Sequence, residues 1–168
     1  NVFQLMLIRS AIGLILLSPL IWRAGGLAVM RTKRLPQHLG RNTIHFGAQL
    51  GWFYALTLIP IGQLVAIEFT MPIWTAILAA AFLCERMTVW KTAAIVLGLV
   101  GVIVIVRPAT GEVNPGQLIA LAVAVGFGIS VAMVKSLTRT EQTLTILFWM
   151  LMVQSTAGLF PALYVWTW

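Results

Sequence analysis

Charged residues are scarce in this sequence, and acidic residues are the scarcest. Only 9% of its 168 residues are charged, whereas a soluble domain carries about 25% charged residues. Four Asp and Glu stand against eleven Lys and Arg, and 60% of the residues are hydrophobic. This composition excludes an ordinary soluble domain and predicts an integral membrane protein with almost no soluble mass.

The same scarcity argues against several kinds of reactive site. Cys84 is the single cysteine, so no intrachain disulfide can form. Only Glu68 among the acidic residues lies deep in an apolar run, which rules out a pair of intramembrane aspartates. His38 and His45 lack the close spacing of helical zinc ligands, and no Gly-x-Ser-x-Gly or phosphate-cradling glycine loop occurs. We expect no enzyme, no catalytic residue, no metal and no cofactor.

Apolar runs free of turn signals predict the membrane spans. A span needs about 20 mostly apolar residues. The runs cover residues 3–22, 42–59, 63–83, 91–106, 116–135 and 143–166. Ile59-Pro60-Ile61-Gly62 joins the second and third runs, and so short a turn suits only an antiparallel hairpin. The predicted fold class is all-α, a polytopic membrane helix bundle of about six transmembrane helices.

Basic residues between the runs predict the topology. The loops after the first, third and fifth runs hold nine Lys and Arg, whereas the opposite loops hold only Arg107. The positive-inside rule therefore places the three basic loops in the cytoplasm and both chain ends outside. The net charge of +7 then reflects contact with the lipid bilayer and not with nucleic acid. Because residue 1 is Asn and both ends fall in or against apolar runs, we expect a piece of a longer protein.

Two charged residues, Arg9 and Glu68, fall inside predicted spans. A charge at bilayer depth costs about 2.5–3.5 kcal/mol, so such residues need a partner or a role. Both residues lie roughly 10 Å deep at about 1.5 Å per residue, in spans that run the same way. Either they form a structural ion pair, or Glu68 binds a cation, a proton or a cationic substrate group while Arg9 assists. Both interpretations stay open.

Pro72 follows Glu68 by four residues and cannot donate a backbone hydrogen bond to its carbonyl, which predicts a helix kink. Interrupted helices near charged groups are common where transporters bind substrates, although many kinked helices have no such role. Other polar and aromatic side chains either form hydrogen bonds and packing contacts between helices or line a substrate pathway. These candidates are Gln49, Trp52, Trp74 and Gln154.

Four segments together resemble the EamA-type drug/metabolite transporter superfamily. They are Trp52-Phe-Tyr-Ala-Leu-Thr-Leu-Ile-Pro60, Ala66-Ile-Glu-Phe-Thr-Met-Pro72, Phe82-Leu-Cys-Glu85-Arg86 and Gly98-Leu-Val-Gly-Val-Ile-Val-Ile. Cys84 stands where the family pattern usually has Gly. The resemblance covers about residues 3–155.

The resemblance implies a ten-helix transporter built from two inverted five-helix repeats. Residues 1–106 would be helices two to five of the first repeat, and residues 107–168 would begin a truncated second repeat. A shift of 142 residues aligns Pro19 with Pro161, as such a repeat requires. The missing helices imply that this chain alone does not transport.

The resemblance also assigns some residues. Arg9 matches an arginine often found in helix two, Pro72 the helix-four proline, and Glu85 the glutamate that ends helix four. Glu68 lies outside the general pattern and would mark a subgroup or a substrate.

The leading hypothesis is therefore a secondary transporter that moves a small polar metabolite across the inner (plasma) membrane, coupled to a proton or to an exchanged metabolite. A homodimer stays open. The rival hypothesis is a non-transporting scaffold or partner-binding bundle, in which Arg9 and Glu68 merely pair and the glutamines merely join helices.

Overall fold

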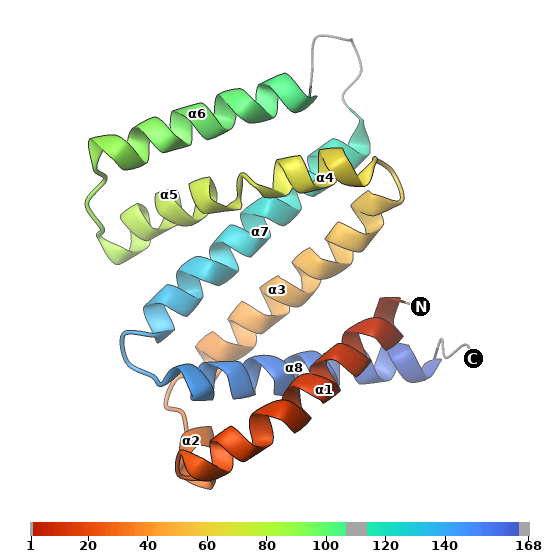
Figure 1. Cartoon of the computed structure of the whole chain (residues 1–168), viewed down its shortest axis with the longest axis vertical. Coiled ribbons are helices and arrows are strands. Elements are labelled where there is room, and N and C mark those ends of the chain that lie inside the picture. Colours follow the sequence, from red (N-terminus) through yellow and green to blue (C-terminus); the bar gives the residue numbers. More distant parts are fainter. Residues whose placement is uncertain (1, 107–113, 165–168) are drawn as a thin grey trace. The chain divides into compact units, whose positions relative to one another are not determined.

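The computed structural model describes residues 2–106 and 114–164, and all regular structure within these ranges is helical (Figure 1). The all-α fold is therefore confirmed for this part of the chain. Arg107 lies outside the described residues, as does the rest of the segment 107–113. The helices are α1 (Val2–Arg23), α2 (Leu27–Met30), α3 (Leu35–Leu56), α4 (Ile61–Glu68), α5 (Met71–Leu83), α6 (Val89–Val106), α7 (Pro115–Leu137) and α8 (Thr143–Tyr164).

Each predicted span has a helical counterpart, and the third is split into α4 and α5. Within the described ranges, three segments are long and apolar enough to cross a membrane: Phe3–Arg23, Ile61–Leu83 and Pro115–Leu137. Val89–Val104 and Thr143–Leu159 are shorter apolar helices. Helix α3 is not among these segments, and it begins at Leu35 instead of residue 42. Its first two turns carry His38 and Arg41, which extend the helix beyond the apolar run.

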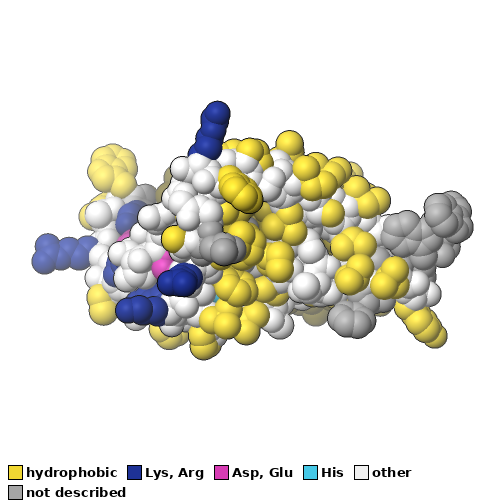
Figure 2. All heavy atoms as spheres, turned by 90° about the horizontal axis from the view of Figure 1, so that it is seen from below, with side chains coloured by type: hydrophobic (Ala, Val, Ile, Leu, Met, Phe, Trp, Pro, Cys, Tyr) yellow, Lys and Arg dark blue, Asp and Glu magenta, His cyan; other side chains and the backbone are white. Residues whose placement is uncertain are grey.

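The helices expose large hydrophobic side chains, as a multi-pass membrane protein does. Trp22 is 83% exposed, Leu97 is 72% exposed and Ile15 is 70% exposed. In Figure 2, hydrophobic side chains form much of the visible surface, and Lys and Arg side chains are few. Contact with lipid removes such surface from water, whereas a soluble monomer rarely exposes large apolar patches.

The chain forms two compact units. Unit 1 contains residues 1–42 and 134–168, and unit 2 contains residues 43–133. These units differ from the predicted division at residue 106, because each takes helices from both sides of it. The division into two repeats stays a prediction.

In unit 1, α1 and α8 pack against each other in opposite directions. A Cβ on Gly13 would lie 2.9 Å from Cδ2 of Leu151, and one on Gly158 would lie 3.8 Å from the backbone nitrogen of Leu7. Close approach at small residues is a common basis of helix association in membranes. Pro19 and Pro161 lie inside α1 and α8, respectively.

In unit 2, glycines on α7 and α3 allow similarly close packing. A Cβ on Gly51 would lie 2.8 Å from Cγ2 of Val123, and one on Gly128 would lie 2.7 Å from Cβ of Trp74. A buried apolar cluster accompanies these contacts; its members are Ala55, Ile59, Leu64, Ile67 and Ala120.

The third predicted span is interrupted at Phe69 and Thr70. Helix α4 ends at Glu68, and α5 begins at Met71 with Pro72 in its first turn. Proline lacks an N–H group and is well tolerated in a first turn, so it favours a new helix start here. The buried hydroxyl of Thr70 donates to the carbonyl of Ile67 at 2.7 Å. The interruption places the Glu68 carboxylate at the end of a half-helix.

Candidate functional site

In unit 2, the Glu68 carboxylate accepts a hydrogen bond from a tryptophan. Nε1 of Trp52, on α3, lies 2.7 Å from Oε2 of Glu68. The indole N–H can only donate, and a carboxylate is its strongest protein acceptor. Both side chains are half-buried. The bond therefore holds a carboxylate beside an aromatic ring at the interrupted helix.

Gln49 adds an unsatisfied polar atom about one turn before Trp52 on α3. It precedes Trp52 by three residues on α3, so the two side chains lie on the same face of the helix. Among the described residues, Oε1 of Gln49 is buried without a hydrogen-bond partner. An unsatisfied buried acceptor costs about 1–3 kcal/mol. A bound ligand or a water molecule with a donor group would satisfy it.

Trp74 lies on the other side of the interruption. Its Nε1 donates to the hydroxyl of Thr70 at 3.2 Å, so the indole is fixed at the start of α5. Its Cβ also faces Gly128 on α7. The structure thus gives Trp74 a packing role and a partner of its own.

In unit 1, Arg9 joins α1 to α8. Its Nη2 donates to Oε1 of Gln154 at 3.2 Å, although the rest of the Arg9 side chain is exposed. Within the described chain, three buried polar atoms around this bond have no partner: Oγ of Ser10, Nε2 of Gln154 and Oγ of Ser155. Unit 1 therefore carries its own strip of polar groups between two apolar helices.

Arg9 and Glu68 belong to different units, and each has a partner within its own unit. Their ion pair and the alternative roles of the two residues stay predictions. Glu85 follows the end of α5, where its Oε2 lies 3.7 Å from Nζ of the exposed Lys91. The assignment of Glu85 as a helix-end motif residue also stays a prediction.

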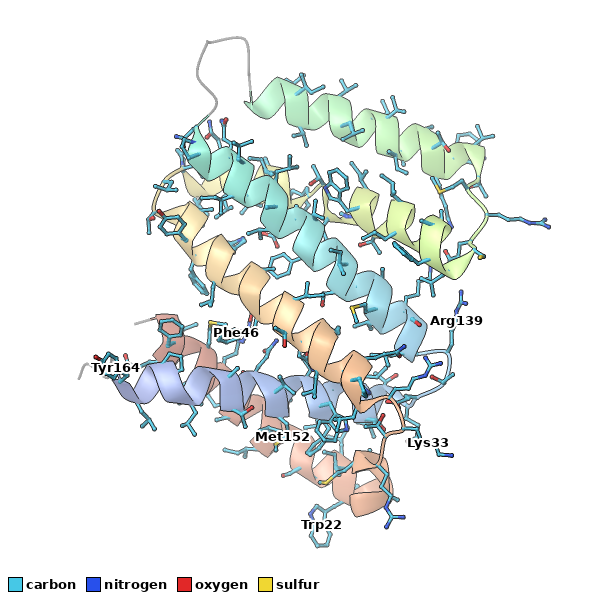
Figure 3. The ribbon with its side chains drawn as sticks, turned by 180° about the vertical axis from the view of Figure 1, so that it is seen from behind. Trp22, Lys33, Phe46, Arg139, Met152 and Tyr164 are labelled. Carbon is cyan, nitrogen blue, oxygen red and sulfur yellow. The ribbon has the colours of Figure 1, made fainter. Side chains whose placement is uncertain are left out.

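Unit 1 also contains a polar cluster that was not predicted from the sequence. Nε2 of His38 lies 2.5 Å from Oε2 of Glu141, and the hydroxyl of Thr32 donates to Oε1 of the same carboxylate. Nearby, Nε1 of Trp149 donates to the carbonyl of Met30 at 3.1 Å. Figure 3 shows this end of the unit, where Lys33 marks the connection between α2 and α3.

The pKa of Glu141 reflects this cluster. Burial alone would raise the pKa of its carboxyl, but hydrogen bonds from Thr32 and His38 and the charges of His38 and Arg34 outweigh burial and lower it. The ionised carboxylate is therefore the form that ties the loop before α8 to the segment before α3.

Charge complementarity was the available signal for this contact. Glu141 is the acidic residue of the loop between α7 and α8, and the loop between α1 and α3 holds several basic residues. The topology predicts that both loops face the same side of the membrane, and their contact in unit 1 agrees with that prediction.

Comparison with known proteins places these features in a family. The model of the EamA-like transporter family matches residues 1–107. The S-adenosylmethionine uptake transporter of Rickettsia felis is 27% identical over 164 residues, which is 98% of this chain and 55% of that protein. The riboflavin transporter of Brucella anthropi is 34% identical over 146 residues, which is 86% of this chain and 51% of that protein.

The chain thus spans about half the length of these relatives. No solved structure matches it significantly. The family match covers more than half of the chain, including Arg9, Glu68 and the interruption between α4 and α5. This chain belongs to the EamA-like transporter family.

Proposed function

We propose that this chain forms part of a secondary transporter that moves a small polar metabolite across the inner (plasma) membrane. The observation that carries the proposal is the hydrogen bond between Trp52 and Glu68 at the break between α4 and α5. Ionisable residues within spans are expensive and mark substrate or ion pathways. Interrupted helices supply binding sites in many transporters, where one repeat rocks against the other.

The site chemistry suits a metabolite with a flat ring and a hydrogen-bond donor or positive charge. Trp52 offers an aromatic face, Glu68 a carboxylate and Gln49 an unsatisfied acceptor. The relatives are named for S-adenosylmethionine and riboflavin, and both compounds contain a heteroaromatic ring. These two compounds are therefore the first to test as substrates.

We include in this proposal that transport is coupled to a proton or to an exchanged metabolite. Glu68 would then be the group that binds the proton or the metabolite. Proton coupling requires uptake into vesicles to follow an imposed pH gradient. Exchange requires uptake to depend on a metabolite loaded inside the vesicles.

The protein could also assemble as a homodimer. The molecular mass of the protein in lipid nanodiscs tests this assembly.

Trp52→Phe tests the proposal directly in vesicles that contain the whole protein. The variant keeps an aromatic ring and removes the N–H that binds Glu68, so we expect flux of the transported metabolite to fall about tenfold. Trp90→Phe is the matched control, because Trp90 is 85% exposed on α6. Equal flux in the two variants would argue against the site.

The scaffold alternative makes a different prediction for the same variants. If Trp52 and Glu68 only hold helices together, Trp52→Phe lowers thermal stability, and the unmodified protein carries no flux for any metabolite. A transporter loses flux while its melting temperature in detergent changes little.

A further inference from the structure

We propose that a cavity in unit 1, beside the start of α8, binds a phosphate group. The cavity has a volume of about 430 Å³, within the range of about 300–1,000 Å³ typical of small-molecule sites. The α2–α3 connection and the loop before α8 form its walls, and its polar lining includes Arg31, Thr32, Lys33, Arg34 and Glu141. Transport as proposed above does not require this site.

The charge of the lining favours an anion. Arg31, Lys33 and Arg34 contribute three positive charges and Glu141 contributes one negative charge, which leaves a net charge of two positive. In the described part of the chain, the side chains of Arg31 and Lys33 have no hydrogen-bond or ion-pair partner. Their donors therefore remain for a ligand.

Glu141 helps to shape the cavity, and the three basic lining residues outweigh its single negative charge. One carboxylate oxygen accepts from Thr32 and the other contacts His38, so neither oxygen lacks a partner. The backbone N–H of Arg34 in turn donates to the hydroxyl of Thr32 at 2.9 Å. This chain of bonds fixes the segment that carries the three basic residues.

Phosphate is the anion that fits these donors best. A guanidinium group presents paired N–H donors that match two phosphate oxygens, and Lys adds a compact positive charge. The cavity adjoins Ala24, directly after the apolar helix α1 ends at Arg23, where lipid headgroups would lie. The phosphate comes either from an anionic phospholipid headgroup or from a soluble compound.

The test uses the whole protein in nanodiscs of phosphatidylcholine and follows its melting temperature. One arm adds inorganic phosphate, with potassium chloride at equal ionic strength as the reference. The other arm replaces part of the phosphatidylcholine with phosphatidylglycerol. The test variant is Arg31→Gln/Lys33→Gln, and the control Arg23→Gln/Arg86→Gln removes the same charge at exposed residues that do not line the cavity.

We expect at least one arm to raise the melting temperature of the unmodified protein and of the control. The test variant should need on the order of tenfold more ligand for the same shift, because it lacks two charged donors. A shift with inorganic phosphate identifies a soluble ligand, and a shift with phosphatidylglycerol alone identifies a lipid. The absence of both shifts, or an equal loss in the control, overturns the proposal.

If the double variant does not fold, Lys33→Gln against Arg86→Gln repeats the comparison with one charge. Both side chains are exposed, so neither change disturbs the packing. A smaller shift for Lys33→Gln than for Arg86→Gln supports the site, and equal shifts contradict it.

Discussion

Helices pack closely at glycines within unit 1 and within unit 2, and the two units differ in their polar contacts. In unit 1, polar side chains join segments far apart in the sequence, as in the bonds of Glu141 with His38 and Thr32 and of Arg9 with Gln154. In unit 2, glycines on α3 and α7 bring helices into close contact around an apolar cluster. Unit 2 also has polar bonds between helices, such as those of Trp52 with Glu68 and of Ser130 with His45.

The difference follows from the solvent of each region. Lipid is as apolar as a leucine side chain, so helices in a bilayer associate through close packing and a few hydrogen bonds. The bonds of Glu141 lie beyond the apolar runs, where water and headgroups make charged side chains inexpensive. The bond of Arg9 with Gln154, in contrast, joins the apolar helices α1 and α8. An ionisable side chain among apolar helices costs free energy. Glu68, which accepts a hydrogen bond from Trp52 at the interrupted helix, is such a side chain.

The comparison predicts the largest loss of stability for Glu141→Ala. This change leaves the buried His38, whose side chain is 1% exposed, without its carboxylate partner. We expect a loss of about 2–3 kcal/mol in the free energy of unfolding. Glu85→Ala is the control, because its pair with Lys91 is 3.7 Å long and more exposed than that of His38 with Glu141, and surface pairs contribute about 0–1 kcal/mol. Equal losses would show that the polar cluster does not hold unit 1.

Unit 2 should be sensitive to added volume instead. Gly128→Ala places a Cβ 2.7 Å from Cβ of Trp74 and 3.2 Å from the backbone nitrogen of Thr75, so a helix must move. We expect a loss of about 2 kcal/mol in chemical unfolding. Gly47→Ala on α3 is the matched control, because no atom lies within 4 Å of its added Cβ. Comparable stability of the two variants would contradict close packing at α7.

Acidification should act on unit 1 through Glu141. The pKa of this carboxyl is lowered in the folded protein, so the unfolded chain binds the proton more readily. The stabilising contribution is therefore complete above the ordinary glutamate pKa and is lost as the pH falls through the lowered folded value. Melting temperatures measured from neutral to acid pH should fall more for the unmodified protein than for Glu141→Gln. Parallel curves would contradict this linkage.

The smallest effect is expected at Cys84, which ends α5 with a φ of 53°. A residue with a Cβ is strained by about 1–2 kcal/mol in the left-handed region. Glycine avoids this strain but loses more backbone entropy on folding, which offsets part of the gain. Cys84→Gly should therefore raise stability by about 0.5–1 kcal/mol in thermal unfolding. Cys84→Ala keeps a Cβ and should bring no gain, and an equal gain from both variants would exclude the backbone as the cause.

The sequence predicted the helices well because apolar runs report directly on membrane crossing. The run 3–22 corresponds to α1, and the run 116–135 corresponds to α7, each within two residues. The early start of α3 was missed because its first turns are polar, and helix length need not follow hydropathy. The family resemblance had also marked residue 84 as a glycine position, and its positive φ supplies the physical reason.

The polar contacts were harder to predict. His38 and Glu141 are 103 residues apart, and the opposite charges of their two loops are a signal too general to name this pair. Arg9 and Glu68 were identified because a charge inside an apolar run costs free energy. That cost indicates that each needs a partner but not which residue the partner is. The structure supplies Gln154 for one and Trp52 for the other, and neither partner follows from periodicity or spacing.

Glu68→Gln in the whole protein tests the central claim most directly. Flux of a labelled metabolite panel, which includes S-adenosylmethionine and riboflavin, is measured in vesicles at equal membrane expression of unmodified protein and Glu68→Gln. Selective loss of flux for the transported metabolite in Glu68→Gln is the predicted result. Unchanged flux in Glu68→Gln would contradict the account and leave Glu68 a structural partner of Trp52.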